Sequence, residues 1–371
     1  MSSFSTPKIS NISNENDVYR FTLSNINVSM ANAIRRTILT EIPTVCFITE
    51  SEATNTCTIL ENSTRLHNEI LKQRLACVPV FEKTMDRLSE KYLLEINIKN
   101  DTDNTLFVTT EHFKVKNKST GEYLSIEEQR AIFPPDSITN EYIDFVRLRP
   151  KVNGVLSGEH IHLICEFSVS NAKHNSCYNV VSKCAYEYTP DLEKIKTVWE
   201  QQQNKLLAEE VSPEDIEFQK RNFMLLDSQR HYIPDSFNFV VQTLGIYENQ
   251  EILKKACGII QNKFVDYIQA VDSDILPIRV SETTVENSFD IILEEEDYTL
   301  GKVIECFFYT NMYVKDKILT YCGFKKMHPH DNFSTVRIAF AEKVDKSMVR
   351  QVFRTVCVDA GDLFKIIYKM F

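Results

Sequence analysis

The sequence predicts an α+β protein, a pseudo-dimer of two related units of which the first is interrupted by a β-rich inserted domain. The same order of strand, helix, strand and helix occurs near both ends of the 371-residue chain. Alternating apolar residues, which are typical of strands, fill much of the stretch between these ends. The last helix has an apolar stripe wider than a lone surface helix needs, which predicts a partner helix. On pattern alone, two unrelated α+β domains remain the alternative.

The first unit begins with a strand and a helix. In VYRFTLS, the residues Tyr19, Phe21 and Leu23 fall on one strand face. The following helix is apolar at every third or fourth position, and Pro43 ends it. Its predicted buried stripe is Met30, Ala33, Ile34, Thr37 and Ile38.

The same pattern returns near residue 288. SFDIIL places Phe289, Ile291 and Leu293 on one strand face, and Asp297 is in position to cap the next helix. The apolar stripe of that helix is Leu300, Val303, Ile304, Phe307 and Phe308.

Each unit closes with a strand and a long helix. DSFNFVVQTLG leads into a helix from about 250 to 270, and STVRIAF leads into one that runs nearly to Phe371. The stripe of the last helix is wide enough to predict a covering helix. The first stripe is Ile252, Ala256, Ile259, Ile260, Phe264 and Tyr267. The second is Val349, Val352, Phe353, Val356, Ala360, Leu363, Phe364 and Ile367.

The residues between these pieces have a different character. A helix is expected from about Ser63 to Ala76, with apolar positions at Leu66, Ile70, Leu71 and Leu75. Four alternating segments then predict strands: YLLEINIK, TLFVTTEHFKV, HIHLICEFSV and KCAYEY. We therefore expect the first unit at 1–50 plus 232–275, the inserted domain at 51–190, a charged helical connection at 191–231, a linker at 276–285 and the second unit at 286–371.

Composition limits the function classes. A net charge of -10 argues against a protein that coats nucleic acid by charge alone. The eight glycines form neither GxGxxG nor GxxxxGK, so no nucleotide-binding loop is expected. No apolar run approaches the roughly 18 residues of a membrane span, and the polar start lacks the apolar core of a signal peptide. We expect an intracellular protein with no membrane partner.

Candidate catalytic groups are few. Asp101 and Asp103 lie in NDTDN, a segment whose composition is typical of a turn. The acidic run 294–297 favours the start of the following helix. Neither set is therefore expected to hold a catalytic metal ion. The ten cysteines are scattered without a CxxC motif, which indicates small buried side chains in a reducing compartment. A cysteine nucleophile paired with a distant histidine has no local signature and remains an alternative.

Histidines and cysteines give no clear metal site. His160 and His162 share the polar face of a strand, whereas Cys165 points to the other face. His328 and His330 lie in a turn that contains proline. We expect no catalytic residue, no cofactor and no metal ion in this chain.

Arg35 and Arg36 lie off the apolar stripe of the first helix. Arginine suits bidentate pairing with carboxylates at protein interfaces. A solvated helix face is the competing interpretation.

Longer motifs resemble a known family. FTLSNINVSMANAIRRTILTEIPTVCF resembles the opening signature of the RNA polymerase α-type subunits, which include bacterial α, the archaeal D polypeptide and eukaryotic subunit 3. NSTRLHNEILKQRLACVPV, SNAKHNSCYNVVSKCAYEYTP and PDSFNFVVQTLGIYENQEILKKACGII resemble later segments of that family. FDIILEEEDYTLGKVIECFF and YCGFKKMHPHDNFSTVRIAF are similar to the archaeal L polypeptide and eukaryotic subunit 11.

The resemblance implies that two paralogous dimerisation partners are fused in one chain, as in large double-stranded DNA viruses. It implies a non-catalytic assembly platform of a multisubunit DNA-directed RNA polymerase. The expected partners are the largest (β′-like) and second-largest (β-like) subunits and small accessory subunits resembling those numbered 10 and 12, with DNA contacted only indirectly. A viral protein of this kind is expected in the host cytoplasm and in the virion, with the nucleus as the alternative.

The resemblance also implies site residues. Those of the large-subunit interface are Asn32, Arg35, Arg36, Glu69 and Arg74. Those of the dimerisation helices are Ile34, Ile38, Ile259, Phe264, Leu300, Ile304, Phe307, Phe353, Val356 and Leu363.

Some features depart from the family, and two rival functions remain. Where relatives have HTLGN this chain has YTLGK, and the inserted domain has only the widely spaced Cys165, Cys177 and Cys184, which predicts no zinc or iron–sulfur centre. A dimeric DNA-binding transcription factor would need a basic recognition helix, which the sequence lacks. A cysteine- or metal-dependent enzyme would need a reactive thiol or bound zinc.

Overall fold

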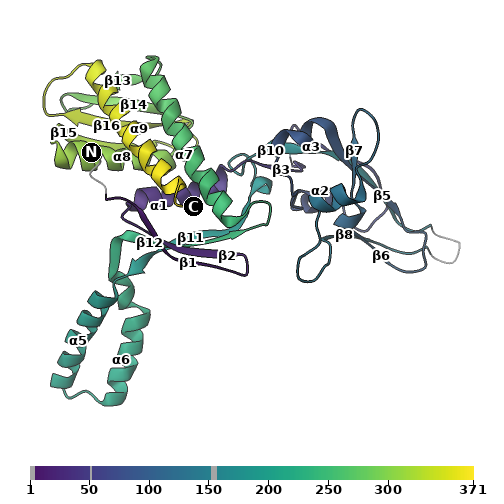
Figure 1. Cartoon of the computed structure of the whole chain (residues 1–371), viewed down its shortest axis with the longest axis horizontal. Helices are drawn as coiled ribbons and strands as arrows, with labels where there is room; N and C mark the ends of the chain where they lie inside the picture. Colours follow the sequence, from purple (N-terminus) through teal and green to yellow (C-terminus); the bar gives the residue numbers. More distant parts are fainter. Residues whose placement is uncertain (1–4, 51, 152–156) are drawn as a thin grey trace. The chain divides into compact units, whose positions relative to one another are not determined.

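The computed structural model describes residues 5–50, 52–151 and 157–371 (Figure 1). These residues form two compact structural units, which divide the chain differently from the two repeated units predicted above, and from here on "first unit" and "second unit" refer to these structural units. The first unit contains the described residues up to Ile38 together with Lys183–Gln242 and Asn249–Phe371, and the second contains Leu39–Ser182 and Thr243–Glu248. The predicted start of the insertion, residue 51, lies outside the described residues.

The first unit contains two halves, each built on a four-stranded sheet with the same plan. One sheet has the order β1-β2-β12-β11, and the other has the order β13-β14-β16-β15. In both, the two central strands are followed along the chain by a helix: β2 by α1, β12 by α7, β14 by α8 and β16 by α9.

The elements of the first sheet are β1 (Lys8–Glu15), β2 (Val18–Ser24), β11 (Val181–Pro190) and β12 (Tyr232–Thr243), with helices α1 (Val28–Thr40) and α7 (Asn249–Asp272). The predicted strand face of Tyr19, Phe21 and Leu23 is buried, and the predicted stripe of α1 is buried as well. Both predictions are confirmed. The segment KCAYEY was expected among the inserted strands, but it lies in β11, which pairs with β12. Its tyrosines contact rings of that strand: Tyr188 stacks on Tyr232 with centroids 4.2 Å apart, and Tyr186 meets Phe237 edge-on at 5.3 Å.

The elements of the second sheet are β13 (Ile278–Val280), β14 (Ser288–Glu294), β15 (Leu319–Lys325) and β16 (Phe333–Phe340), with helices α8 (Tyr298–Phe307) and α9 (Lys346–Tyr368). A π-helical segment, Phe308–Lys315, continues α8. The predicted strands and helices are confirmed here. The segment 276–285 is not only a linker, because β13 within it pairs with β14 and sets Ile278 opposite Ile291.

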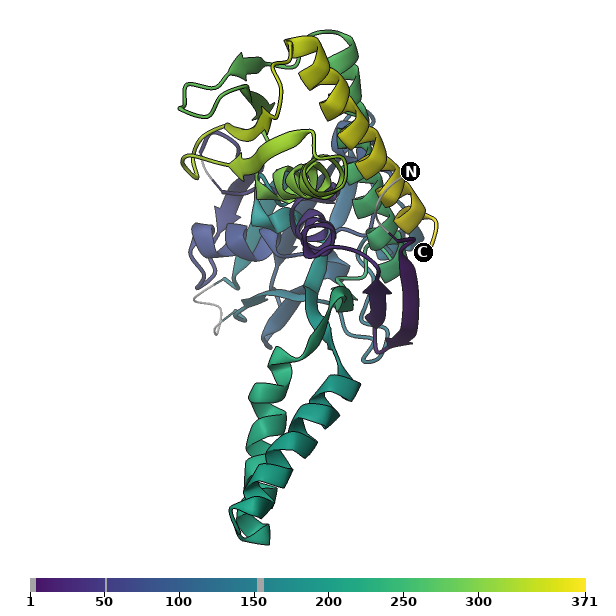
Figure 2. The ribbon, with the colours of Figure 1, turned by 90° about the vertical axis from the view of Figure 1, so that its left-hand side faces the viewer.

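Besides its two sheets, the first unit has a pair of long helices and a helical hairpin. Helices α7 and α9 lie side by side in both views (Figures 1 and 2). Residues between β11 and β12 form a hairpin of two helices, α5 (Leu192–Ala208) and α6 (Pro213–Leu225), followed by the short 3-10 helix η3 (Asp227–Arg230). The predicted helical connection is therefore a helical hairpin.

The second unit is rich in strands. One sheet has the order β4-β9-β5-β7, and two further pairs are β6 with β8 and β10 with β3. The strands are β3 (Thr44–Cys46), β4 (Cys57–Asn62), β5 (Tyr92–Lys99), β6 (Leu106–Thr109), β7 (Lys114–Asn117), β8 (Asp144–Leu148), β9 (His160–Glu166) and β10 (Ser168–Ser170). The helices are α2 (Asn68–Ala76), α3 (Met85–Lys91), α4 (Ile126–Ile132) and the short η1 (Thr110–His112) and η2 (Ser176–Tyr178).

Two elements of the second unit differ from the sequence prediction. The helix expected from residue 63 begins only at Asn68, because Asn62 accepts a hydrogen bond from the amide of Thr64 at 3.0 Å and donates one to the carbonyl of Leu66 at 2.8 Å, which holds these residues in a turn. Ile70, which was predicted on the apolar stripe, lies on α2 but is exposed, whereas Leu71 and Leu75 are buried. The strand expected at 105–115 is broken by η1, which Thr109 and His112 cap reciprocally.

Candidate functional site

The predicted dimerisation residues gather where the two sheets and their helices meet in the first unit. Ile259 is half-buried. The other residues of this set are all buried, namely Ile34, Ile38, Phe264, Leu300, Ile304, Phe307, Phe353, Val356 and Leu363. Helices α7 and α9, which follow central strands of different sheets, bury apolar side chains against each other, and this burial is the main force that holds them together.

Aromatic rings form part of the contact between α7 and α9. Phe264 stacks on Phe364 with ring centroids 6.2 Å apart, and Tyr267 meets Phe353 edge-on at 5.9 Å. Near the end of α7, Asp272 accepts hydrogen bonds from Nε and Nη2 of Arg354 at 2.8 and 3.2 Å. Because this ion pair is exposed, it adds little to the free energy of folding and mainly orients the two helices. The sequence could not identify it, because its members are far apart in the chain.

A groove of about 510 Å³ lies between α1 and α8 in the first unit. It is lined by Asn27, Val28, Ser29, Asn32, Tyr186, Lys302, Glu305, Cys306, Tyr309 and Cys322. Burial raises the pKa of the Cys306 thiol to about 11 and that of Cys322 to about 11. Both thiols are therefore protonated at neutral pH and are poor nucleophiles. The groove is suited to holding a side chain or segment of another protein.

Arg36 connects α1 to the start of α8. Its Nε donates to the hydroxyl of Thr299 at 2.7 Å, and its Nη2 donates to Oδ2 of Asp297 at 2.5 Å. Asp297 also caps α8 by accepting from the amide of Thr299 at 2.7 Å. The interaction links the two halves of the first unit. The sequence indicated an arginine suited to an interface, and the partner found here belongs to the same chain.

Arg35, in contrast, donates hydrogen bonds within its own helix. Its Nε and Nη2 donate to Oδ1 of Asn32 at 3.1 and 2.8 Å. Asn32 in turn lines the groove. The two adjacent arginines therefore have different structural roles.

Substituting these arginines should separate the two roles. Arg36→Met is expected to lower the free energy of unfolding by about 1 kcal/mol, because it removes a half-exposed ion pair and a hydrogen bond between helices. Arg35→Met is expected to cost less than about 0.5 kcal/mol, as is usual for surface changes. Chemical denaturation followed by circular dichroism measures both. Equal losses in the two variants would contradict the assignment.

The remaining predicted interface residues lie on α2 in the second unit. Glu69 is exposed, with 83% of its side-chain surface accessible. Arg74 is held, since its Nε and Nη2 donate to the carbonyls of Phe145 and Asp144 at 2.7 and 2.6 Å. Glu69, whose Oε2 lies 3.8 Å from Nδ1 of His67, is thus accessible to a partner, whereas Arg74 fixes α2 against β8.

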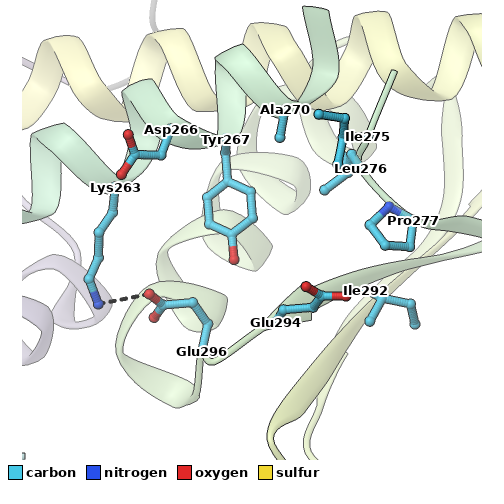
Figure 3. Close-up of a pocket in the computed structure, with 10 residues that line it drawn as sticks. All are labelled: Lys263, Asp266, Tyr267, Ala270, Ile275, Leu276, Pro277, Ile292, Glu294 and Glu296. Carbon is cyan, nitrogen blue, oxygen red and sulfur yellow. Dashed lines mark ion pairs between the residues drawn. The ribbon is translucent and has the colours of Figure 1, made fainter. Parts of the chain in front are cut away.

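A second pocket, of about 320 Å³, lies between α7 and the second sheet (Figure 3). Nζ of Lys263 is 2.7 Å from Oε1 of Glu296, and the Tyr267 hydroxyl points toward the two glutamates at the pocket floor (Figure 3). Burial, with Glu296 and Glu294 nearby, raises the pKa of Tyr267. The phenol stays protonated at neutral pH and can donate a hydrogen bond.

The candidate metal ligands are occupied by other partners. His160 lies 2.8 Å from Oδ1 of Asn97, and His162 lies 3.3 Å from Oε1 of Glu95. Cys165 is buried opposite Cys57, and the hydrogen bond between their thiols, together with burial, raises the pKa of Cys165. Within residues 5–50, 52–151 and 157–371, no group of three or more His, Cys, Asp or Glu side chains is arranged to hold a metal.

The helices also bear on membrane association. In the described part of the chain, no helix combines the length and the apolar character that crossing a bilayer requires.

Comparison with known proteins identifies the family. The profile of the RNA polymerase Rpb3/Rpb11 dimerisation domain matches residues 20–264. A conjugation stage-specific protein of Tetrahymena thermophila is 22% identical over 287 residues, which are 66% of this chain and 88% of that protein. The DNA-directed RNA polymerase subunit Rpo3 of Pyrococcus horikoshii is 25% identical over 267 residues, 71% of this chain and 98% of that protein.

A third relative shares a shorter segment. The DNA-directed RNA polymerase II subunit rpb3 of Dictyostelium discoideum is 32% identical over 82 residues, which are 22% of this chain and 24% of that protein. The family match extends over more than half of the 371 residues and includes α1, β12 and most of β2 and α7. The chain therefore belongs to the RNA polymerase Rpb3/Rpb11 dimerisation domain family.

Proposed function

We propose that this protein is a non-catalytic assembly subunit of a multisubunit DNA-directed RNA polymerase, in which two dimerisation partners are fused as a pseudo-dimer. The observation that carries the proposal is the repeated plan of the first unit. The two sheets have the same strand order, and the helix that follows β12 in one sheet, α7, contacts the helix that follows β16 in the other, α9. The relatives named as polymerase subunits Rpo3 and rpb3 supply the context.

Fusion has a physical advantage for such a protein. Two separate partners must meet at a rate that depends on their concentrations, whereas linked halves meet at effective concentrations that reach the millimolar range. The short connection through β13 keeps the halves together before any larger subunit arrives. The strands inserted between α1 and β11 belong to the second unit and provide a further surface.

The proposed partners are the largest and second-largest subunits, with small accessory subunits resembling those numbered 10 and 12. We assign the large-subunit contact in the first unit to the groove between α1 and α8, which Asn32 lines, and to Arg35, which donates to Asn32. In the second unit we assign it to the exposed Glu69 on α2. The chain is proposed to act inside the cell, and in the virion and host cytoplasm if it is viral.

Affinity purification of the tagged protein from its native cells tests the proposal. Two very large polypeptides are expected to copurify with it and to carry RNA synthesis activity on added DNA template. Arg35→Glu should reduce their recovery while the isolated variant keeps its helical circular dichroism, because the hydrogen bonds of Arg35 lie within α1. A monodisperse protein recovered without any large polypeptide would refute the proposal.

A further inference from the structure

The two helices of the hairpin α5–α6 pack against each other through a small apolar core. Trp199 and Phe223 lie with ring centroids 5.6 Å apart, and Ile195, Leu206 and Ile216 are buried with them. At its base, the amide of Asp191 donates to the carbonyl of His231 at 3.0 Å. The hairpin extends away from β11 and β12 in both views (Figures 1 and 2). It is therefore an arm with a core of its own.

Helix α6 has a second apolar face that this core does not use. Phe218 and Leu225 are seven residues apart, so they lie on one side of the helix about 10 Å from each other. Their exposed fractions are 64% and 68%. A surface helix normally has one apolar stripe, and a second one indicates a second packing partner.

Charge indicates the chemistry of that partner. The tip sequence EEVSPEDIE, residues 209–217, contains five carboxylates and neither lysine nor arginine. Such a tip repels the phosphates of nucleic acid and of anionic lipid. It attracts a surface that presents Lys or Arg side chains, and such complementarity mainly sets the rate and the specificity of association.

We propose that the outer face of α6, centred on Phe218 and Leu225, docks a second protein of the polymerase assembly through an apolar groove flanked by basic side chains. The acidic tip orients that protein, and the two apolar side chains anchor it. This inference rests on the proposed function, because the partner is sought among the subunits that copurify. The arm is then a contact surface additional to the groove between α1 and α8.

Site-specific photocrosslinking of the purified complex tests the docking surface. The photoreactive residue p-benzoylphenylalanine replaces Phe218, and a matched control places it at Ile138, which is 91% exposed in the second unit. The expected result is one adduct from position 218 to a single other subunit, at a peptide that contains Lys or Arg, and no such adduct from position 138.

Two further variants separate the contributions. Leu225→Ser should lower the adduct yield from position 218 at least about fivefold, since loss of an anchoring side chain weakens binding. The triple variant Glu209→Lys, Glu210→Lys, Glu214→Lys should lower it by a similar factor at low salt. Unchanged circular dichroism confirms that the arm is folded, as expected for exposed positions.

The outcomes distinguish the two proposals. Adducts with nucleic acid, with a second copy of this chain, or in equal yield from both positions would overturn the docking surface. The same holds if the large subunits copurify and position 218 gives no adduct, an outcome that leaves the assembly role intact. If no polymerase subunit copurifies with the unmodified chain, both proposals fail.

Discussion

Replacing Phe353 by alanine is expected to lower the free energy of unfolding by about 3–5 kcal/mol, the range typical of a buried aromatic ring lost from a core. Phe353 is fully buried on α9. Its ring lies 5.9 Å from that of Tyr267 and 6.3 Å from that of Phe308. The substitution leaves a cavity at the point where helices of both halves meet, and the surrounding rings cannot fill it without moving the helix backbones.

Thermal and urea denaturation followed by circular dichroism measure this loss. The matched control is Ile366→Ala on the same helix, where the side chain is 40% exposed and the expected change is below about 1 kcal/mol. A similar loss in both variants would mean that the α7–α9 contact contributes no more than an ordinary surface position. A large loss for Phe353→Ala alone supports a continuous core shared by the two halves.

Dividing the chain between Glu282 and Thr283 is expected to give two fragments that fold only together. The cut lies in the exposed turn between β13 and β14, so it breaks no buried contact. Each fragment alone exposes the apolar face of its long helix, and such faces aggregate in water. When coexpressed, residues 1–282 and 283–371 should elute from a sizing column as a 1:1 complex, with strand β13 still paired to β14 across the cut.

A variant pair makes this experiment specific. Phe353→Ala in the shorter fragment should weaken the complex more than about tenfold, since a central buried aromatic is the kind of residue that dominates an interface. Ile366→Ala should leave it nearly unchanged. Two soluble, independently folded monomers would contradict the pseudo-dimer, and so would equal weakening by the two substitutions.

Local patterns predicted most of the elements that make up the first unit. The alternation of Tyr19, Phe21 and Leu23 and the stripe of α1 are both found buried. These predictions succeed because side-chain direction repeats every two residues in a strand and every 3.6 residues in a helix, so a half-buried element reveals itself in its own sequence. The cap of α8 by Asp297 was also visible, because capping depends on neighbours in the chain.

Predictions failed where a local hydrogen bond competed with the pattern. Asn62 holds a turn where apolar spacing suggested a helix, and Thr109 with His112 starts a 3-10 turn inside an alternating run. Side chains that bond to nearby backbone offer the chain an alternative to regular structure, and apolar periodicity does not register them.

The sequence by itself determined the two strand–helix plans, the wide stripe of the last helix and the charged helical connection. Only the tertiary structure decided that Arg36 pairs with Asp297, that KCAYEY joins the first sheet, and that α6 keeps a second apolar face outside its own core. The reason is distance along the chain. Periodicity is set by neighbouring residues, whereas a contact between positions 36 and 297 exists only after folding has brought two remote helices together.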